Sequence, residues 1–187
     1  MKNSKAKMFN KKASDPKNKP DQIIESMGLK ETQNIADIGS GGGYFSLRFA
    51  EAVGKNGKVY PVDTNSNFLK FIKDIAEERG VSNIIPILVA ENHLPIPAGS
   101  LDFIFMRDVT HHIQNRVQYF GNLKNFLKPN GRIVIIEYKK KKSFSFHSMF
   151  GHHIAKEVII HEMKEAGYLL EKDFDFLPEH NFTVYRG

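Results

Sequence analysis

The stretch IADIGSGGGYFSLRF, residues 35–49, places a glycine-rich turn between an apolar run and a helical pattern. A strand, a glycine turn and a helix form a ligand site, because free N–H groups and the positive helix end face the bend. No Lys follows as in a phosphate loop, and Tyr44 and Ser46 stand where the dinucleotide fingerprint GxGxxG requires glycine. The motif present is instead D-x-G-x-G-x-G, with Asp37, Gly39, Gly41 and Gly43.

Two acidic residues indicate what such a turn binds. Asp37 lies at the end of the first apolar run, and Asp63 ends the next one, KVYPVD (58–63). A carboxylate this close to the turn repels a pyrophosphate but attracts a cationic ligand, such as the ammonium and sulfonium of S-adenosylmethionine. An acid at the end of the second strand can accept both hydroxyl groups of a ribose and disfavours a ribose phosphate.

Apolar runs alternate with helical patterns along the rest of the chain. The runs predict strands at 34–38, 58–63, 84–90, 101–106 and 132–138, and the helical patterns lie near 20–30, 45–53, 68–79, 113–127 and 154–166. Strands that are apolar on both faces and alternate with helices indicate a parallel sheet covered on each side. Only LPEH separates two further strand patterns, at 168–176 and 181–186, which predicts a hairpin and an antiparallel last strand.

Several segments together resemble a known family. DIGSGGG, VYPVD, AENHLPIPAGSLDFIF and LKPNGRIVIIEY are similar to class I S-adenosylmethionine-dependent methyltransferases, over residues 20–187. With QIIESMGLK, RDVTHH and EMKEAGY…DFLPEHNF, the pattern resembles small methyltransferases that are similar in the core to quinone-biosynthesis methyltransferases. The resemblance implies one Rossmann-like, doubly wound α/β domain. It also implies a seven-stranded sheet in the order 3-2-1-4-5-7-6, with the last strand antiparallel.

The resemblance also implies a set of cofactor-binding residues. In such proteins the glycine turn lies along the methionine part of S-adenosylmethionine, the acid of the second strand holds the ribose, and the segment after the third strand lines the adenine. Relatives often have Gly-Asp before Ala-Glu where this chain has Leu88-Val89, so Glu91 or Asn92 must contact the adenine amino group. The expected set is Asp37, Gly39, Ser40, Gly41, Gly43, Tyr44, Asp63, Thr64, Ala90, Glu91, Asn92 and Arg107.

Candidate catalytic residues follow the fourth strand, in RDVTHH (107–112). Methyl transfer needs an acceptor held in line with the methyl carbon and, for some acceptors, a base that removes a proton. Asp108 paired with His111 or His112 can act as that base, and we expect Asp108 and His111 to be catalytic. In the alternative interpretation, Asp108 caps the following helix and the histidines pack against the sheet.

Three further features follow the candidate catalytic residues along the chain. Glu137 and Tyr138 end the fifth strand, where they either shape an acceptor pocket or finish the strand. The insertion 139–153, with four lysines and several Phe and His residues, is a candidate lid or a solvated loop. His153, Glu157 and His161 have metal-ligand spacing, but no zinc motif matches and the resemblance implies no metal, so we expect none.

The charge distribution limits the classes of partner that we expect. The net charge of +6 comes from residues 1–19, which hold seven Lys and one Asp, while the rest of the chain has as many acidic as basic groups. We expect residues 1–19 to be a flexible basic tail, residues 20–187 to be the methyltransferase domain, and nucleic acid not to be a partner. No apolar run is long enough to span a bilayer and the chain has no Cys, so we expect a cytoplasmic protein.

These observations predict an S-adenosylmethionine-dependent methyltransferase that acts on an unidentified acceptor, which we expect to be a small molecule. The alternative is a non-catalytic module that binds S-adenosylmethionine or S-adenosylhomocysteine and regulates a partner. The cofactor residues do not distinguish the two functions, because both need the same turn and the same acids.

Overall fold

A computed structural model describes residues 3–89, 94–139 and 154–187. Its centre is a seven-stranded sheet in the order β3-β2-β1-β4-β5-β7-β6. The strands are β1 (Asn34–Ile38), β2 (Lys58–Asp63), β3 (Ile87–Leu88), β4 (Leu101–Arg107), β5 (Leu127–Tyr138), β6 (Leu169–Phe174) and β7 (His180–Arg186). Strands β1 to β5 are parallel, whereas β7 is antiparallel to both β5 and β6. The predicted α/β class, strand order and antiparallel last strand are confirmed.

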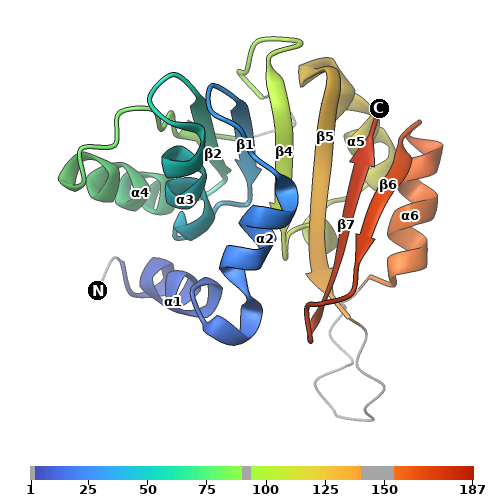
Figure 1. The fold of residues 1–187 in the computed structure, drawn as a ribbon, viewed down its shortest axis with the longest axis horizontal. Coiled ribbons are helices and arrows are strands. Elements are labelled where there is room, and N and C mark those ends of the chain that lie inside the picture. The colour runs from blue at the N-terminus through green and yellow to red at the C-terminus, as the bar shows by residue number, and fades with distance from the viewer. Residues whose placement is uncertain (1–2, 90–93, 140–153) are drawn as a thin grey trace.

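Helices cover both faces of this sheet (Figure 1). They are α1 (Ser4–Ala13), α2 (Pro20–Met27), α3 (Tyr44–Val53), α4 (Ser66–Glu78), α5 (Arg116–Leu123) and α6 (Lys156–Glu165), with short 3-10 turns at Pro16–Asn18, Thr110–His112 and Lys124–Phe126. On one face Phe45 and Phe49 of α3 pack against Phe105 of β4, with ring centroids 5.0 Å apart in each pair. On the other face, Phe120 of α5 and Met163 of α6 are fully buried in a second cluster.

Three elements differ in length from the sequence-based prediction. The third strand is only Ile87–Leu88, preceded by a single bridge between Val59 and Ile84, because Pro86 has no N–H to donate to a ladder. The helix expected over 113–127 is divided into α5 and the 3-10 turn Lys124–Phe126, and another 3-10 turn, Thr110–His112, precedes it. Strand β5 begins before Pro129-Asn130-Gly131, and its pairing with β4 is irregular between Leu101 and Phe103.

Residues 4–13, which the sequence placed in a flexible tail, form helix α1 in the structure and pack on the body. Ala6 is 1% exposed and clusters with Phe68 and Phe71 of α4, and the Phe9 ring lies edge-on to Phe68 at 5.6 Å. Ala6 and Phe9 are three residues apart and share one helix face, which allows this packing. The seven lysines of the segment made it look like a solvated tail. In Figure 1, α1 lies at the lower edge of the molecule, the edge toward which β5 points.

No helix in the described ranges is long and apolar enough to cross a membrane.

Candidate functional site

The carboxyl ends of the parallel strands meet at one edge of the sheet, where open α/β folds bind their ligands. Asp37 is paired in the β1–β2 ladder, Asp63 ends β2, Arg107 ends β4 and Tyr138 ends β5. The structure therefore brings the expected cofactor residues Asp37, Asp63 and Arg107 to the same edge.

The glycine turn between β1 and α3 needs its glycines for both conformation and space. Gly39, Gly41 and Gly43 have φ angles of 74°, 54° and 79°, which L side chains rarely adopt. A Cβ atom on Gly43 would lie 2.4 Å from Ile72 Cγ1, and one on Gly39 would lie 2.7 Å from Val109 Cγ2. The turn therefore packs against α4 and against the loop after β4, both of which border the site.

Asp63 ties the glycine turn to the end of β2. Its Oδ2 accepts a hydrogen bond from the Gly41 N–H at 2.9 Å, and its Oδ1 accepts one from the Asn65 N–H at 2.9 Å. A carboxylate has about four lone-pair positions, so both oxygens retain acceptor capacity for ribose hydroxyl groups. Thr64, the next residue, is exposed.

Asp37 is a buried carboxyl, 4% exposed, at the base of the turn. The pKa of Asp37 is raised to about 7, because burial and, to a lesser extent, nearby Asp63 favour the neutral form, while the hydrogen bond from Ser46 Oγ at 2.5 Å opposes the shift. Near neutral pH this group is therefore poised between protonation states, and a cation beside it favours the ionised form. This chemistry fits a ligand that carries an ammonium or a sulfonium.

Helix α1 lies across the glycine turn. Asn10 Oδ1 accepts the Tyr44 N–H at 3.1 Å, and Asn10 Nδ2 donates to the Gly42 carbonyl at 2.8 Å. A Cβ atom on Gly41 would lie 3.2 Å from the Phe9 ring, and the Lys12 ammonium lies 4.7 Å from the Tyr138 ring centroid. Sequence reasoning missed these contacts, although the amphipathic spacing of Ala6 and Phe9 was a detectable signal.

Arg107 stands between the glycine turn and the rim of β5. Its side chain is 9% exposed and its guanidinium lies 5.1 Å from the Phe45 ring centroid. Burial lowers the pKa of Arg107, while Asp108, Tyr138, Asp37 and Tyr44 favour its charged form. Within the described residues, Arg107 Nε and Nη1 have no hydrogen-bond partner, and neither has buried Ser40 Oγ. Such unpaired buried groups at a strand end have hydrogen-bonding capacity that a ligand can use.

Two histidine–carboxylate pairs flank the end of β5, and they differ from the predicted pairing of Asp108 with His111 or His112. His111 Nδ1 lies 3.0 Å from Glu137 Oε1, while Thr110 Oγ1 donates to Glu137 Oε2 at 2.5 Å. Asp108 Oδ1 instead lies 3.1 Å from Nε2 of His180, the first residue of β7. The carboxylate that contacts His111 is therefore that of Glu137, and sequence reasoning missed His180.

The alternative interpretation of RDVTHH is only partly observed. Val109, not Asp108, is the N-cap of the 3-10 turn Thr110–His112, and that turn has no side-chain cap. The His111 side chain is 8% exposed, so it does pack within the rim, whereas His112 is exposed. Asp108 has a positive φ of 54°, which is uncommon outside glycine.

Some expected site residues lie outside the described ranges. Ala90, Glu91 and Asn92, expected at the adenine, belong to this group, as does nearly all of the candidate lid at 139–153. His153 lies outside as well, and among the residues that are described no group of three His, Asp or Glu can hold a metal ion.

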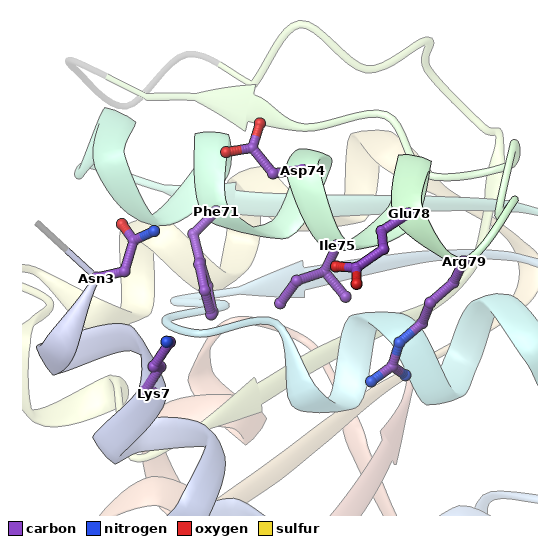
Figure 2. Close-up of a pocket in the computed structure, with 7 residues that line it drawn as sticks. All are labelled: Asn3, Lys7, Phe71, Asp74, Ile75, Glu78 and Arg79. Atoms are coloured by element: carbon purple, nitrogen blue, oxygen red, sulfur yellow. The ribbon is translucent and has the colours of Figure 1, made fainter.

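A hollow between α1 and α4 does not contain the predicted site (Figure 2). Its lining residues are Asn3, Lys7, Phe71, Asp74, Ile75, Glu78 and Arg79. None of them belongs to the expected cofactor or catalytic residues. The two basic groups of the lining, Lys7 and Arg79, are matched by two acidic groups, Asp74 and Glu78. The strand ends, with their unpaired polar atoms, are therefore the better candidate for a ligand site.

Comparisons with known proteins show the family to which the chain belongs. A family model described as "Methyltransferase domain" matches residues 29–173. The ubiquinone/menaquinone biosynthesis C-methyltransferase UbiE of Pseudomonas putida strain GB-1 is 26% identical over 193 residues, covering 88% of this chain and 75% of that protein. The chain belongs to the methyltransferase domain family, and the class I S-adenosylmethionine-dependent methyltransferase expected from the sequence is confirmed.

Solved structures extend the likeness of the fold. A SAM-dependent methyltransferase from Aquifex aeolicus has a TM-score of 0.81 and 23% identity, with 95% of this chain and 96% of that chain covered. The [4+2]-cyclase SpnF has a TM-score of 0.75 and 15% identity, with 89% and 78% covered. Since one fold carries both reaction types, the acceptor chemistry must be argued from the rim residues.

Proposed function

We propose that this methyltransferase acts on a small-molecule acceptor with a hydroxylated ring, and that it does so at the rim formed by β4, β5 and β7. The observation that carries the proposal is the His111–Glu137 pair, which lies at the same sheet edge as Asp37 and Asp63. The name of the Pseudomonas relative, a quinone-biosynthesis C-methyltransferase, supports a hydroxylated ring as the acceptor. We place the reaction in the cytoplasm.

The proposed cofactor contacts follow from the chemistry of each group. Asp37 meets the cationic methionine part, Asp63 accepts the ribose hydroxyl groups, and the open Ser40 Oγ and Arg107 N–H groups are suited to the methionine carboxylate. The glycines with Tyr44 and Thr64 border the ligand, and Ala90, Glu91 and Asn92 stay the proposed adenine contacts. The bound cofactor supplies an electrophilic methyl group on a sulfonium.

The proposed base is His111. In this proposal Nε2 of His111 takes the proton of the acceptor hydroxyl, while the contact of Glu137 with Nδ1 orients the ring. Removal of that proton makes the acceptor oxygen, or a ring carbon conjugated with it, more nucleophilic. Asp108 stays a proposed member of the acceptor side, with His180 as its partner.

The test is S-adenosylhomocysteine formation with an acceptor panel of small phenols, quinone precursors, amines, protein and RNA. The account expects turnover with phenols or quinone precursors and a strong loss in His111→Ala, while His161→Ala on the exposed face of α6 keeps the wild-type rate. Turnover that is confined to protein or RNA would overturn the small-molecule proposal.

The second candidate function is a cofactor-binding module without catalysis. It is favoured by α1, which covers the glycine turn through Asn10 and Phe9. Tight binding of S-adenosylhomocysteine with no product from any acceptor in the panel would support the module over the enzyme.

A further inference from the structure

Four residues converge on the α1 side of the sheet edge, and we call them the Asp108 cluster: Arg107, Asp108, Tyr138 and His180. Tyr138 and His180 are direct partners in the β5–β7 ladder, so their side chains lie on the same face, with rings 4.3 Å apart. Arg107 follows Phe105 by two residues on β4 and lies over Phe45 of α3, on that same face. The ladder register therefore places Arg107, Tyr138 and His180 on one face, and Asp108 joins them through its contacts with His180 and Arg107.

The cluster has hydrogen-bonding capacity that the described residues do not use. Asp108 Oδ1, His180 Nε2, Arg107 Nε and Arg107 Nη1 are all buried atoms without a hydrogen-bond partner there. Asp108 Oδ1 and His180 Nε2 are 3.1 Å apart, but they are not aligned as a hydrogen bond, so the contact is electrostatic only. The His180 side chain is 2% exposed, which makes its unpaired nitrogen costly unless a ligand completes it.

The backbone at Asp108 adds an independent observation. Its φ of 54° places a residue with a Cβ in a region that favours glycine. Residues in such conformations concentrate at ligand and active sites, where the side chain is needed despite the strain. Asp108 thus combines an unfavourable conformation with an unpaired oxygen, and neither feature stabilises the folded chain by itself.

The unpaired atoms have the pattern of a hydroxyl-binding subsite. A ligand hydroxyl can donate a hydrogen bond to Asp108 Oδ1, while its oxygen accepts one from His180 Nε2–H. Arg107 lies beside them, its Nε 3.9 Å from Asp108 Oδ2, and Lys12 lies over Tyr138, so cationic groups outnumber the single carboxylate. This excess of positive charge favours a hydroxyl that ionises readily.

We propose that the Asp108 cluster binds an acidic hydroxyl group, phenolic or enolic, on the acceptor, with Asp108 Oδ1 and His180 Nε2 as its direct contacts. The proposal rests on the proposed function, because it assigns the acceptor to this side of the cofactor residues. It adds two specificity-determining contacts that act in binding and that are separate from the His111–Glu137 pair.

The test uses 4-nitrophenol as the probe, since its ionised form absorbs visible light, and 4-nitroanisole, which lacks the hydroxyl, as the matched probe. Both are titrated into the full chain saturated with S-adenosylhomocysteine. The protein variants are Asp108→Gly, His180→Gln and His180→Phe, with His161→Phe on exposed α6 as the control histidine. Thermal melting and S-adenosylhomocysteine affinity are recorded for each variant.

We expect wild type to bind 4-nitrophenol with a change in its absorption spectrum, and to bind 4-nitroanisole at least about tenfold more weakly. Asp108→Gly and His180→Phe should each weaken 4-nitrophenol about 10-fold to 100-fold and leave 4-nitroanisole unchanged. His180→Gln, which keeps an amide donor, should recover part of the affinity, and His161→Phe should match wild type. Asp108→Gly should also melt about 1–3 °C higher, because glycine relieves the positive φ.

Equal affinity for both probes in wild type, or unchanged 4-nitrophenol binding in folded Asp108→Gly and His180→Gln, would overturn the subsite. Those results leave the proposed function intact if the acceptor panel still yields S-adenosylhomocysteine. Failure of wild type to bind S-adenosylhomocysteine would instead defeat the cofactor assignment, and 4-nitrophenol titrated into the cofactor-free chain then decides the subsite by the same criteria.

Discussion

The two histidine–carboxylate pairs at the rim use the same residue types, but they differ in how well their atoms are satisfied. Glu137, which is 1% exposed, is contacted by Thr110 Oγ1, His111 Nδ1 and the Tyr138 N–H. Asp108 and His180 approach to 3.1 Å without alignment, and Asp108 has a positive φ. The first pair is a complete network, whereas the second has capacity left for a ligand.

Strand alternation explains why there are two pairs and not one. Glu137 and Tyr138 are neighbours on β5, so their side chains point to opposite faces of the sheet. Glu137 shares the face of Ile133 and Ile135 with α5 and α6, while Tyr138 meets His180 on the face of α1 to α3. A shift of one residue along β5, from Glu137 to Tyr138, therefore changes both the partner of the side chain and its role.

The largest expected effect concerns the complete pair. His111→Ala should slow turnover about 10²-fold to 10⁴-fold, because a general base acts chiefly in the transition state. Affinity for S-adenosylhomocysteine should stay near wild type, and a higher pH should restore part of the rate, since the acceptor then ionises without the base. Steady-state kinetics across pH, with calorimetry on the same variant, make the measurement. Full turnover in a normally folded His111→Ala would remove the base from the account.

The next prediction contrasts the two carboxylates by stability. Glu137→Ala should lower the free energy of unfolding by about 2–4 kcal/mol, since it removes the buried carboxylate that contacts Thr110 Oγ1 and His111 Nδ1. Asp108→Gly should leave that free energy unchanged or raised, because it removes strain. Urea unfolding of both variants measures the difference. Equal losses in the two variants would mean that the pairs are equally structural.

Deletion of residues 1–13 should affect only the sheet face on which Asp108 and His180 meet. It removes the burial of Ala6 and Phe9 and the Asn10 hydrogen bonds, so we expect a loss of about 1–3 kcal/mol in the free energy of unfolding. Lys11→Ala, at an exposed position, serves as the control and should change little. Hydrogen exchange should rise in the glycine turn but not at His111. An unchanged unfolding transition after the deletion would show that α1 does not hold the body.

Asp37 is a third carboxyl at the same edge, and its effect on stability should appear as a dependence on pH. Because burial raises the pKa of Asp37 to about 7, its contribution to stability is complete below the unfolded pKa of 3.8. The contribution is lost as pH rises through about 7, since the unfolded chain ionises the group more easily. Unfolding free energies should therefore fall between pH 4 and pH 7 in wild type and fall less in Asp37→Asn, with the difference growing by about 1 kcal/mol for each pH unit. Parallel pH profiles would contradict the raised pKa.

The sheet was predictable because its signals are local. Apolar runs and the LPEH gap predicted the strands and the antiparallel β7, whereas the correct strand order was implied by the resemblance to class I methyltransferases. Strand β3 is shorter than its apolar run suggests, since Pro86 interrupts the ladder. Local pattern was therefore sufficient for the existence of the elements, although not for all their lengths.

The rim and α1 were not predictable in the same way. His180 reaches Asp108 only through the β5–β7 register, a contact between residues 72 positions apart that no motif records. The lysines of residues 1–19 dominated the composition, whereas two apolar residues, Ala6 and Phe9, decide how α1 packs. Tertiary contacts of this kind override what composition suggests, because burial of a few side chains outweighs a solvated charged face.

The central claim, that the glycine turn with Asp63 binds the adenosyl cofactor, is tested most directly by calorimetric titration of S-adenosylhomocysteine. The account predicts a micromolar dissociation constant for wild type and no heat from NAD or ATP. Asp63→Ala should weaken binding by about 1.5–3 kcal/mol, because it removes charged acceptors from two ribose hydroxyl groups. An unchanged dissociation constant in Asp63→Ala, or binding of NAD in place of S-adenosylhomocysteine, would contradict it.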